Sequence, residues 1–164
     1  VRMSNKVYIE TSIVSYLTAR PSRDLMAAAA QQATQEWWEQ QRHRFALYIS
    51  PVVLEEAALG DTKAAEKRTL ALQNIPILEL TSEVLKLAEA FMVQKVLSPK
   101  EKQDSVHVAV ATVYELNYLL TWNCRHIANA EIQKRMAQTS HQLGYELPRI
   151  CTPYELLGGL TNVE

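Results

Sequence analysis

Short apolar runs alternate with helix-like segments along the chain, and this alternation constrains the fold more than any other feature. Apolar, partly β-branched runs at residues 6–10, 45–50, 75–80, 118–121 and 149–151 predict five strands. Segments with helical periodicity lie between these runs, notably at 24–44 and 100–116. Strands that alternate with helices form parallel sheets covered on both faces. We therefore expect an α/β protein with a central, mainly parallel five-stranded sheet.

The bulk composition is that of an ordinary globular protein. The 164 residues are 48% hydrophobic and 21% charged, so we expect a single domain over residues 1–164. No stretch approaches the about 20 uninterrupted apolar residues of a membrane helix, and we expect no membrane association. The two cysteines, Cys124 and Cys151, fit a reducing compartment better than a disulfide framework. These features predict a cytoplasmic protein.

Four acid or amide residues occur where an apolar run ends or a helix begins. They are Glu10 in VYIETS, Glu56 in SPVVLEEA, Asp104 in QDSVHVAVA and Asn123 in YLLTWNCRH. In a parallel sheet the carboxyl ends of the strands share one edge, so these residues can share one site. Clustered carboxylates repel one another unless a divalent cation lies between them, an arrangement used in phosphoryl transfer. The pattern indicates a metal-dependent nuclease.

Each of these residues also has a simpler interpretation. Glu10 could lie at a helix entrance, favoured by the helix dipole, with Thr11 or Ser12 as the N-cap. Asp104 could be an N-cap, although a cap does not explain the matching acids after the first two strands. His107, one turn after Asp104 on the same face, could contact the substrate or support a ligand. Such a histidine is more often packed, so His107 is interpreted as lying outside the core site.

Basic residues adjoin two of the four positions. Lys100 and Lys102 precede Asp104, and Arg125 follows Asn123, so these cations could bind phosphates beside the cluster. They could equally be solvated charges at helix ends. The net charge of −1 gives no overall nucleic-acid signature, so an RNA substrate would depend on such local groups.

The motifs VYIETS, SPVVLEEAALGD, DSVHVAVAT and YLLTWNCRHIAN follow one another in an order that resembles the PIN-domain ribonucleases of the VapC-like toxin group. The resemblance implies a three-layer α/β/α PIN-like fold and places the family's acidic positions on Glu10, Glu56, Asp104 and Asn123. Glu55 and Glu56 point about 100° apart on a helix, and the resemblance, not the spacing, favours Glu56. It also implies Mg²⁺ or Mn²⁺ at these side chains, RNA as substrate and a small antitoxin as partner. We therefore predict a metal-dependent endoribonuclease with these four catalytic residues.

Two departures from the family pattern motivate a second hypothesis. The family usually has aspartate where this chain has Glu10, and commonly aspartate where it has Asn123. The longer side chain and the lost charge are consistent with a catalytically weakened PIN-like module that binds RNA or protein. An acid-cluster phosphatase is set aside because no Asp-x-Asp follows the first strand.

The segment 24–44 bears on the oligomeric state. It is predicted to be one long helix, with Trp37 and Trp38 side by side. Neighbouring side chains on a helix point in different directions, so one ring would be exposed for a partner. We therefore expect a homodimer.

Overall fold

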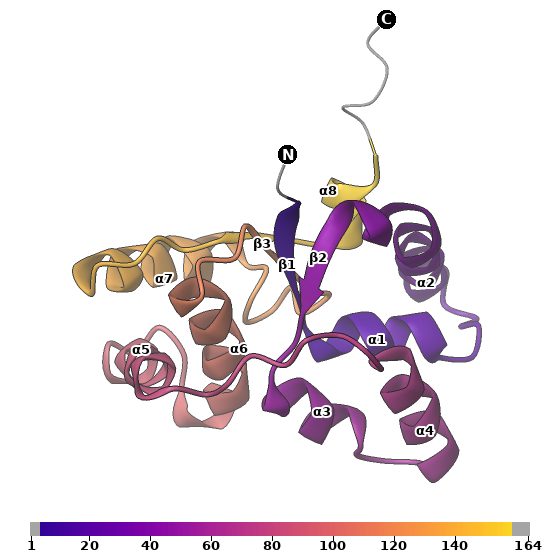
Figure 1. Cartoon of the computed structure of the whole chain (residues 1–164), viewed down its shortest axis with the longest axis horizontal. Coiled ribbons are helices and arrows are strands. Elements are labelled where there is room, and N and C mark those ends of the chain that lie inside the picture. Colours follow the sequence, from indigo (N-terminus) through magenta and orange to yellow (C-terminus); the bar gives the residue numbers. More distant parts are fainter. Residues whose placement is uncertain (1–3, 159–164) are drawn as a thin grey trace, which may run out of the picture.

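The computed structural model of the protein describes residues 4–158, in which a parallel sheet lies between two groups of helices (Figure 1). The strands are β1 (Asn5–Ile9), β2 (Phe45–Tyr48), β3 (Tyr118–Leu120) and β4 (Arg149–Cys151). The α-helices are α1 (Thr11–Thr18), α2 (Leu25–Glu36), α3 (Pro51–Ala57), α4 (Thr62–Ala71), α5 (Ser82–Val93), α6 (Lys102–Val113), α7 (Ala130–Gln142) and α8 (Pro153–Leu156). A π-helical turn, η1 (Trp37–Gln41), and two 3₁₀ turns, η2 (Arg42–Arg44) and η3 (Pro99–Glu101), complete the described elements.

The sheet has the strand order β2-β1-β3-β4, and every adjacent pair is parallel. From β1 the chain crosses to β2 on one side and later returns to β3 on the other side, so the direction of winding reverses at β1. Helices α1 to α4 lie on one side of the sheet, and α5, α6 and α7 on the other (Figure 1). This arrangement confirms the expected three-layer α/β/α fold. It also places a topological switch point, where such sheets bind ligands, between β1 and β3.

The predicted strand at residues 75–80 is absent from the sheet, which therefore has four strands in the described residues and not five. A single parallel bridge joins Ile49 and Ile77 beside the end of β2. It has two hydrogen bonds, from the Ile49 amide to the Pro76 carbonyl (3.0 Å) and from the Leu78 amide to the Ile49 carbonyl (2.8 Å). Pro76 lacks an amide hydrogen, which limits further pairing.

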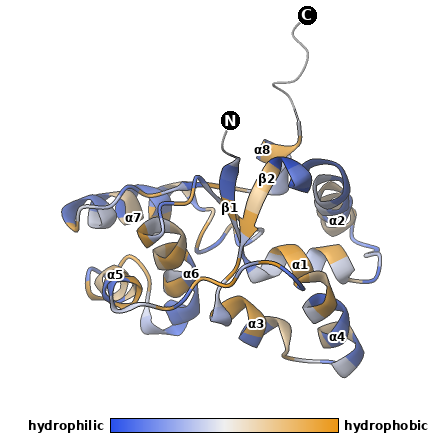
Figure 2. Ribbon diagram, in the orientation of Figure 1, coloured by the Kyte–Doolittle hydropathy of each residue, from blue (hydrophilic) through white to orange (hydrophobic). Residues whose placement is uncertain are grey.

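The core is built on β1, β3 and α6. Val7, Tyr8 and Ile9 of β1 are completely buried, as are Leu119 and Leu120 of β3. Helix α6 is buried from residue 105 to residue 112 because it lies between α5 and the sheet. Figure 2 shows hydrophobic residues along β2 and on stretches of α1 and α6 that face the interior. The segments that carry the candidate residues are therefore firmly anchored.

The long helical segment begins and ends close to the predicted limits. Asp24 is the N-cap of α2 and accepts a hydrogen bond from the Ala27 amide at 2.9 Å, and helical turns continue through η1 and η2 to Arg44. Trp37 is completely buried, and Trp38 is partly buried beneath Arg42, whose guanidinium carbon lies 4.3 Å from the ring centroid. The exposed ring expected to contact a second copy is therefore covered in part by this chain, and the homodimer stays a prediction.

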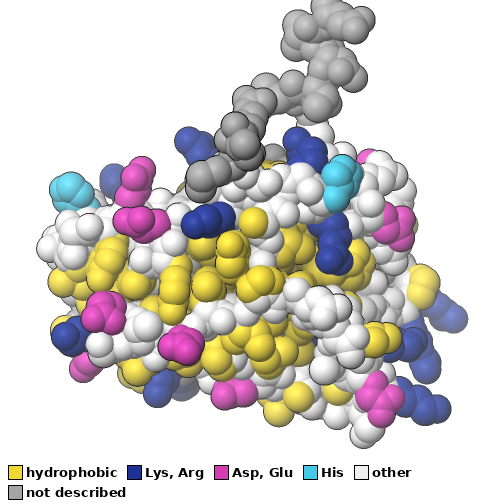
Figure 3. Space-filling view, viewed as in Figure 1, with side chains coloured by type: hydrophobic (Ala, Val, Ile, Leu, Met, Phe, Trp, Pro, Cys, Tyr) yellow, Lys and Arg dark blue, Asp and Glu magenta, His cyan; other side chains and the backbone are white. Residues whose placement is uncertain are grey.

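One face of the molecule carries an apolar region (Figure 3). Apolar side chains gather across the middle of the face that carries β2 and the segment between α4 and α5, with charged side chains toward its margins (Figure 3). Across residues 4–158, every helix is too short or too polar to cross a lipid bilayer. The assignment of residues 1–164 to one domain stays a prediction, since residues 1–3 and 159–164 lie outside the described part.

Candidate active site

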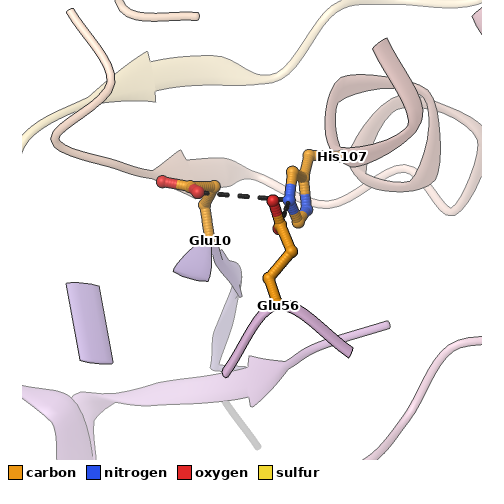
Figure 4. Close-up of side chains that lie close together, drawn as sticks. All are labelled: Glu10, Glu56 and His107. Carbon is orange, nitrogen blue, oxygen red and sulfur yellow. Dashed lines mark hydrogen bonds and ion pairs between the residues drawn. The ribbon is translucent and has the colours of Figure 1, made fainter. Parts of the chain in front are cut away.

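Three ionisable side chains from remote segments converge at the carboxyl edge of the sheet. Glu10 lies between β1 and α1, Glu56 lies on α3, and His107 lies on α6, and all three point toward one another (Figure 4). The His107 Nε2 atom is 2.5 Å from Glu56 Oε1 and 4.0 Å from Glu10 Oε2. One potential metal ligand atom from each residue lies within 4.8 Å of the other two. The cluster is therefore close enough to share one cation.

Glu10 is only 5% exposed and is held by two hydroxyl groups. Its Oε1 atom accepts hydrogen bonds from Thr121 Oγ1 at 2.6 Å and from Ser12 Oγ. Each hydroxyl oxygen in turn accepts a backbone hydrogen bond, from the Asn123 amide (2.9 Å) and the Trp122 amide (2.8 Å) respectively. Both hydroxyl protons are thus directed at Glu10, which fixes Oε1 and leaves Oε2 facing the cluster.

This arrangement corrects the expected N-cap of α1. The helix begins directly after Glu10, and no side chain accepts a hydrogen bond from its first amides. Ser12 donates to Glu10, and Thr11 Oγ1 donates to Glu56 Oε1 at 2.8 Å. A hydrogen bond to a carboxylate is stronger than one between neutral groups, so both hydroxyls act as donors to the acids and not as caps.

The structure distinguishes the adjacent glutamates of α3. Glu55 is exposed to solvent, whereas the Glu56 side chain is 30% exposed and points into the cluster. Burial acts to raise the pKa of Glu56, but the hydrogen bond and positive charge of His107 and the hydrogen bond from Thr11 lower it overall. Glu56 is therefore an ionised hydrogen-bond acceptor at neutral pH.

His107 is completely buried, as its interpretation as a packed residue implied, yet it lies within the site. Its Nδ1 atom is 2.6 Å from the Tyr8 hydroxyl, which is 2.8 Å from Ser50 Oγ. The spacing of three residues from Asp104 on one helical face was the available signal. Nothing in the sequence indicated the contacts with Tyr8 and Glu56, and these define the position of the ring.

We expect the protein to lose stability as the pH rises from about 6.5 through the raised pKa of His107, in the presence of a chelator. Burial alone would lower the pKa of His107, but the hydrogen bond to Glu56 and the nearby carboxylates raise it above its ordinary 6.5. In this window the folded protein retains a proton that the unfolded chain releases, so the free energy of unfolding falls as pH rises. Urea unfolding across this range measures the slope, which should be smaller in His107→Gln. Equal slopes in the two proteins would contradict the expectation.

Asp104 and Asn123 meet beside this cluster. Asp104 is in the first turn of α6 and not at its N-cap, because the helix begins at Lys102. Its Oδ1 atom accepts from Asn123 Nδ2 at 3.1 Å, and its Oδ2 atom is 3.3 Å from His126 Nδ1. Burial is the main cause of a raised pKa for Asp104, opposed by the positive charges of His107 and His126. Asp104 is thus close enough to the cluster to sense its charges.

The amide orientation of Asn123 is fixed by its neighbours. Its Oδ1 atom accepts from the His126 backbone amide at 3.0 Å, so its Nδ2 atom faces Asp104. These contacts suit a residue that holds Asp104 in place. The role of Asn123 as a metal ligand stays a prediction.

The basic residues expected to bind phosphates lie at the surface. Lys100 is in η3, Lys102 begins α6, and Arg125 lies in the turn after β3; all three side chains are exposed. They belong to the two segments that carry Asp104 and Asn123. Their contact with a substrate stays a prediction.

The donor set fits a divalent cation. Glu10, Glu56 and Asp104 supply carboxylate oxygens, the ligands preferred by Mg²⁺ and also suited to Mn²⁺. All three are buried or partly buried, where uncompensated negative charges are costly. A cation between them would remove that cost.

Comparison with known proteins supports the fold. The structure is similar to the Mycobacterium tuberculosis toxin VapC20, described as cleaving the sarcin-ricin loop, with a TM-score of 0.53, 16% identity, and coverage of 69% of this chain and 86% of that one. It is also similar to VapBC2 from Rickettsia felis bound to a DNA fragment from its promoter, with a TM-score of 0.53, 14% identity, and coverage of 90% and 98%. No curated protein matches the chain.

The sequence itself matches the family model of the PIN domain over residues 7–131. This match begins in β1 and ends in α7, so it includes all the residues of the cluster together with Asp104 and Asn123. It covers more than half of the chain. The protein therefore belongs to the PIN domain family.

Proposed function

We propose that this protein is a metal-dependent endoribonuclease that hydrolyses RNA phosphodiester bonds. The observation that carries the proposal is the convergence of Glu10 and Glu56, with Asp104 beside them, at the switch point of a PIN-family sheet. Acids gathered from remote segments at a ligand-binding edge are costly for stability, which favours a catalytic role for them.

Hydrogen bonds within the protein hold the three carboxylates in fixed positions before any substrate binds. Glu10 is held by hydrogen bonds from Ser12 and Thr121. Glu56 is held by His107 and Thr11. Asp104 is held by Asn123. The three acids would hold Mg²⁺ or Mn²⁺, which lowers the pKa of water and neutralises charge on a phosphodiester. Carboxylates with fixed positions need little reorganisation during the reaction. Lys100, Lys102 and Arg125 would bind the flanking phosphates of the RNA.

RNA cleavage by the purified protein tests this proposal. Cleavage should require added Mg²⁺ or Mn²⁺, stop when a chelator is added, and fall sharply in Asp104→Asn, which removes one charge at constant shape. Asp61→Asn is the matched control, because Asp61 is an exposed N-cap of α4 and asparagine caps equally well. Cleavage that persists both with chelator and in Asp104→Asn would refute the assignment.

The partner and the cellular location follow from the same proposal. VapC20 is a toxin, and the VapC-like motifs imply neutralisation by a small antitoxin. We propose that this chain acts in the cytoplasm as such a toxin, as a homodimer. Growth arrest on expression, relieved by a co-expressed antitoxin, would support this role.

One observation favours a catalytically weakened RNA- or protein-binding module as a second candidate. His107 already forms an ion pair with Glu56, so part of the negative charge is balanced by the chain itself. Asn123 adds no charge where relatives commonly have aspartate. Under this alternative the native protein would not cleave RNA, and Glu10→Asp combined with Asn123→Asp would create activity. An active native protein would exclude it.

A further inference from the structure

We infer that His107 is itself a ligand of the divalent ion, through Nε2, together with Glu10 and Glu56. The nitrogen ligand would shift the preference of the site from Mg²⁺ toward Mn²⁺. This inference rests on the proposed function, since the ion is the one that the nuclease would use.

The His107 ring is oriented toward both glutamates. His107 Nε2 points at both glutamates, 2.5 Å from Glu56 Oε1 and 4.0 Å from Glu10 Oε2. Ligand atoms about 2.1 Å from an octahedral ion lie roughly 3.0 Å apart when adjacent and roughly 4.2 Å apart when opposite. The spacing within the cluster, at most 4.8 Å, is therefore near that of a coordination sphere. A small widening of the Glu56 contact would admit an ion in place of the Nε2 proton.

Hydrogen bonds on the opposite side of the ring hold His107 in this orientation. A histidine that binds a metal through one nitrogen usually hydrogen-bonds through the other to a fixed partner. His107 Nδ1 has such a partner in the Tyr8 hydroxyl, at 2.6 Å, and Tyr8 is in turn held by Ser50 at 2.8 Å. All three side chains are completely buried. This chain of hydrogen bonds fixes the ring with Nε2 toward the carboxylates.

The site combines carboxylate oxygens with an imidazole nitrogen, and this combination affects the choice of metal. Mg²⁺ is a hard ion that binds oxygen almost exclusively. Imidazole suits Zn, Cu, Fe and Ni best, and Mn²⁺, although well suited to oxygen, belongs to the same first-row series and accepts a nitrogen ligand more readily than Mg²⁺ does. A buried imidazole added to the carboxylates of Glu10 and Glu56, with Asp104 beside them, should therefore shift the preference of the site from Mg²⁺ toward Mn²⁺. Without nitrogen coordination, His107 would act only as a hydrogen-bond donor to Glu56, and the metal preference would be set by oxygen ligands alone.

A second histidine near the site provides the matched control. His126 Nδ1 lies 3.3 Å from Asp104 Oδ2, and its side chain is 29% exposed. It does not belong to the group of Glu10, Glu56 and His107 whose ligand atoms lie within 4.8 Å of one another. His126→Gln should therefore leave nitrogen coordination intact, whereas His107→Gln should abolish it.

Pulsed electron paramagnetic resonance of the full chain loaded with Mn²⁺ tests the inference directly. The native protein should show modulation from a coordinated ¹⁴N nucleus, which changes to that of ¹⁵N when only histidine is ¹⁵N-labelled. The signal should persist in His126→Gln and be lost in His107→Gln. Titration of the metals should show that the ratio of Mn²⁺ to Mg²⁺ affinity falls in His107→Gln.

The outcomes separate this inference from the proposed function. Bound Mn²⁺ without histidine modulation in the native protein, or modulation lost in His126→Gln, would overturn the inference and leave the nuclease proposal standing. No Mn²⁺ binding at all would overturn both. If His107→Gln does not fold, the labelled native protein and His126→Gln still decide the result.

Discussion

Replacing Glu56 by glutamine should reduce RNA cleavage by at least about 100-fold, whereas the same replacement at Glu55 should leave cleavage unchanged. Mutation of the residues that merely support metal ligands costs roughly 10–100-fold in affinity or activity, so loss of a ligand should cost at least as much. Glu56 contacts both His107 and Thr11 within the site, while Glu55 faces solvent on the same helix.

Glutamine tests the charge of Glu56 and largely preserves its packing. Its amide oxygen can still accept hydrogen bonds from Thr11 Oγ1 and His107 Nε2, so the fold should be retained. The same pair of substitutions should differ in metal binding, with weaker Mn²⁺ binding only in Glu56→Gln. Urea unfolding of both variants controls for stability. Equal loss of cleavage in the two variants, or loss only in Glu55→Gln, would contradict the placement of Glu56 in the site.

The fold could be predicted from the sequence because its central elements depend on local pattern. β1 is a short apolar run followed by a polar residue, and α6 is a long apolar run with helical length. Residues 75–80 carry the same kind of pattern, yet they form a single bridge. Whether an extended segment joins a sheet depends on the edge it meets, here the residue Ile49 after β2. That information is not local to the segment.

The candidate site was predictable only in part, for a similar reason. Glu10 and Asp104 could be found because each acid adjoins an apolar pattern, at the end of a strand or near the start of a helix. Glu56 lies in the last turn of α3, and only the family resemblance favoured it over Glu55. His107 lies within a helix that is buried all round, where a histidine is usually a packed residue. The hydroxyls of Ser12 and Thr121 have common alternative uses in caps and turns. Thr121 reaches Glu10 because β1 pairs with β3, and Ser12 is oriented by the Trp122 amide that follows β3.

Leu119 lies at the centre of the pairing between β1 and β3. Leu119→Ala should therefore lower the free energy of unfolding by about 3–5 kcal/mol. Leu119 is completely buried in β3, with Tyr8 and Ile150 as its partners on the neighbouring strands. Truncation leaves a cavity at the centre of the sheet, where surrounding strands cannot easily collapse. Leu70→Ala is the matched control, because Leu70 is 65% exposed on α4 and its loss should cost within about 0.5 kcal/mol.

Urea unfolding in the presence of a chelator measures both variants without stabilisation by bound ions. The free energy of unfolding of a small protein is only about 5–15 kcal/mol. If the native value is near the lower end of this range, Leu119→Ala should populate the unfolded state measurably. Equal destabilisation by the two substitutions would show that β3 is not at the centre of the core. The Leu119 side chain makes no polar contact with the site, so cleavage per folded molecule should be preserved. A greater loss of cleavage would mean that β3 must be rigid to hold Thr121 against Glu10, because that hydroxyl is placed by the strand that Leu119 anchors.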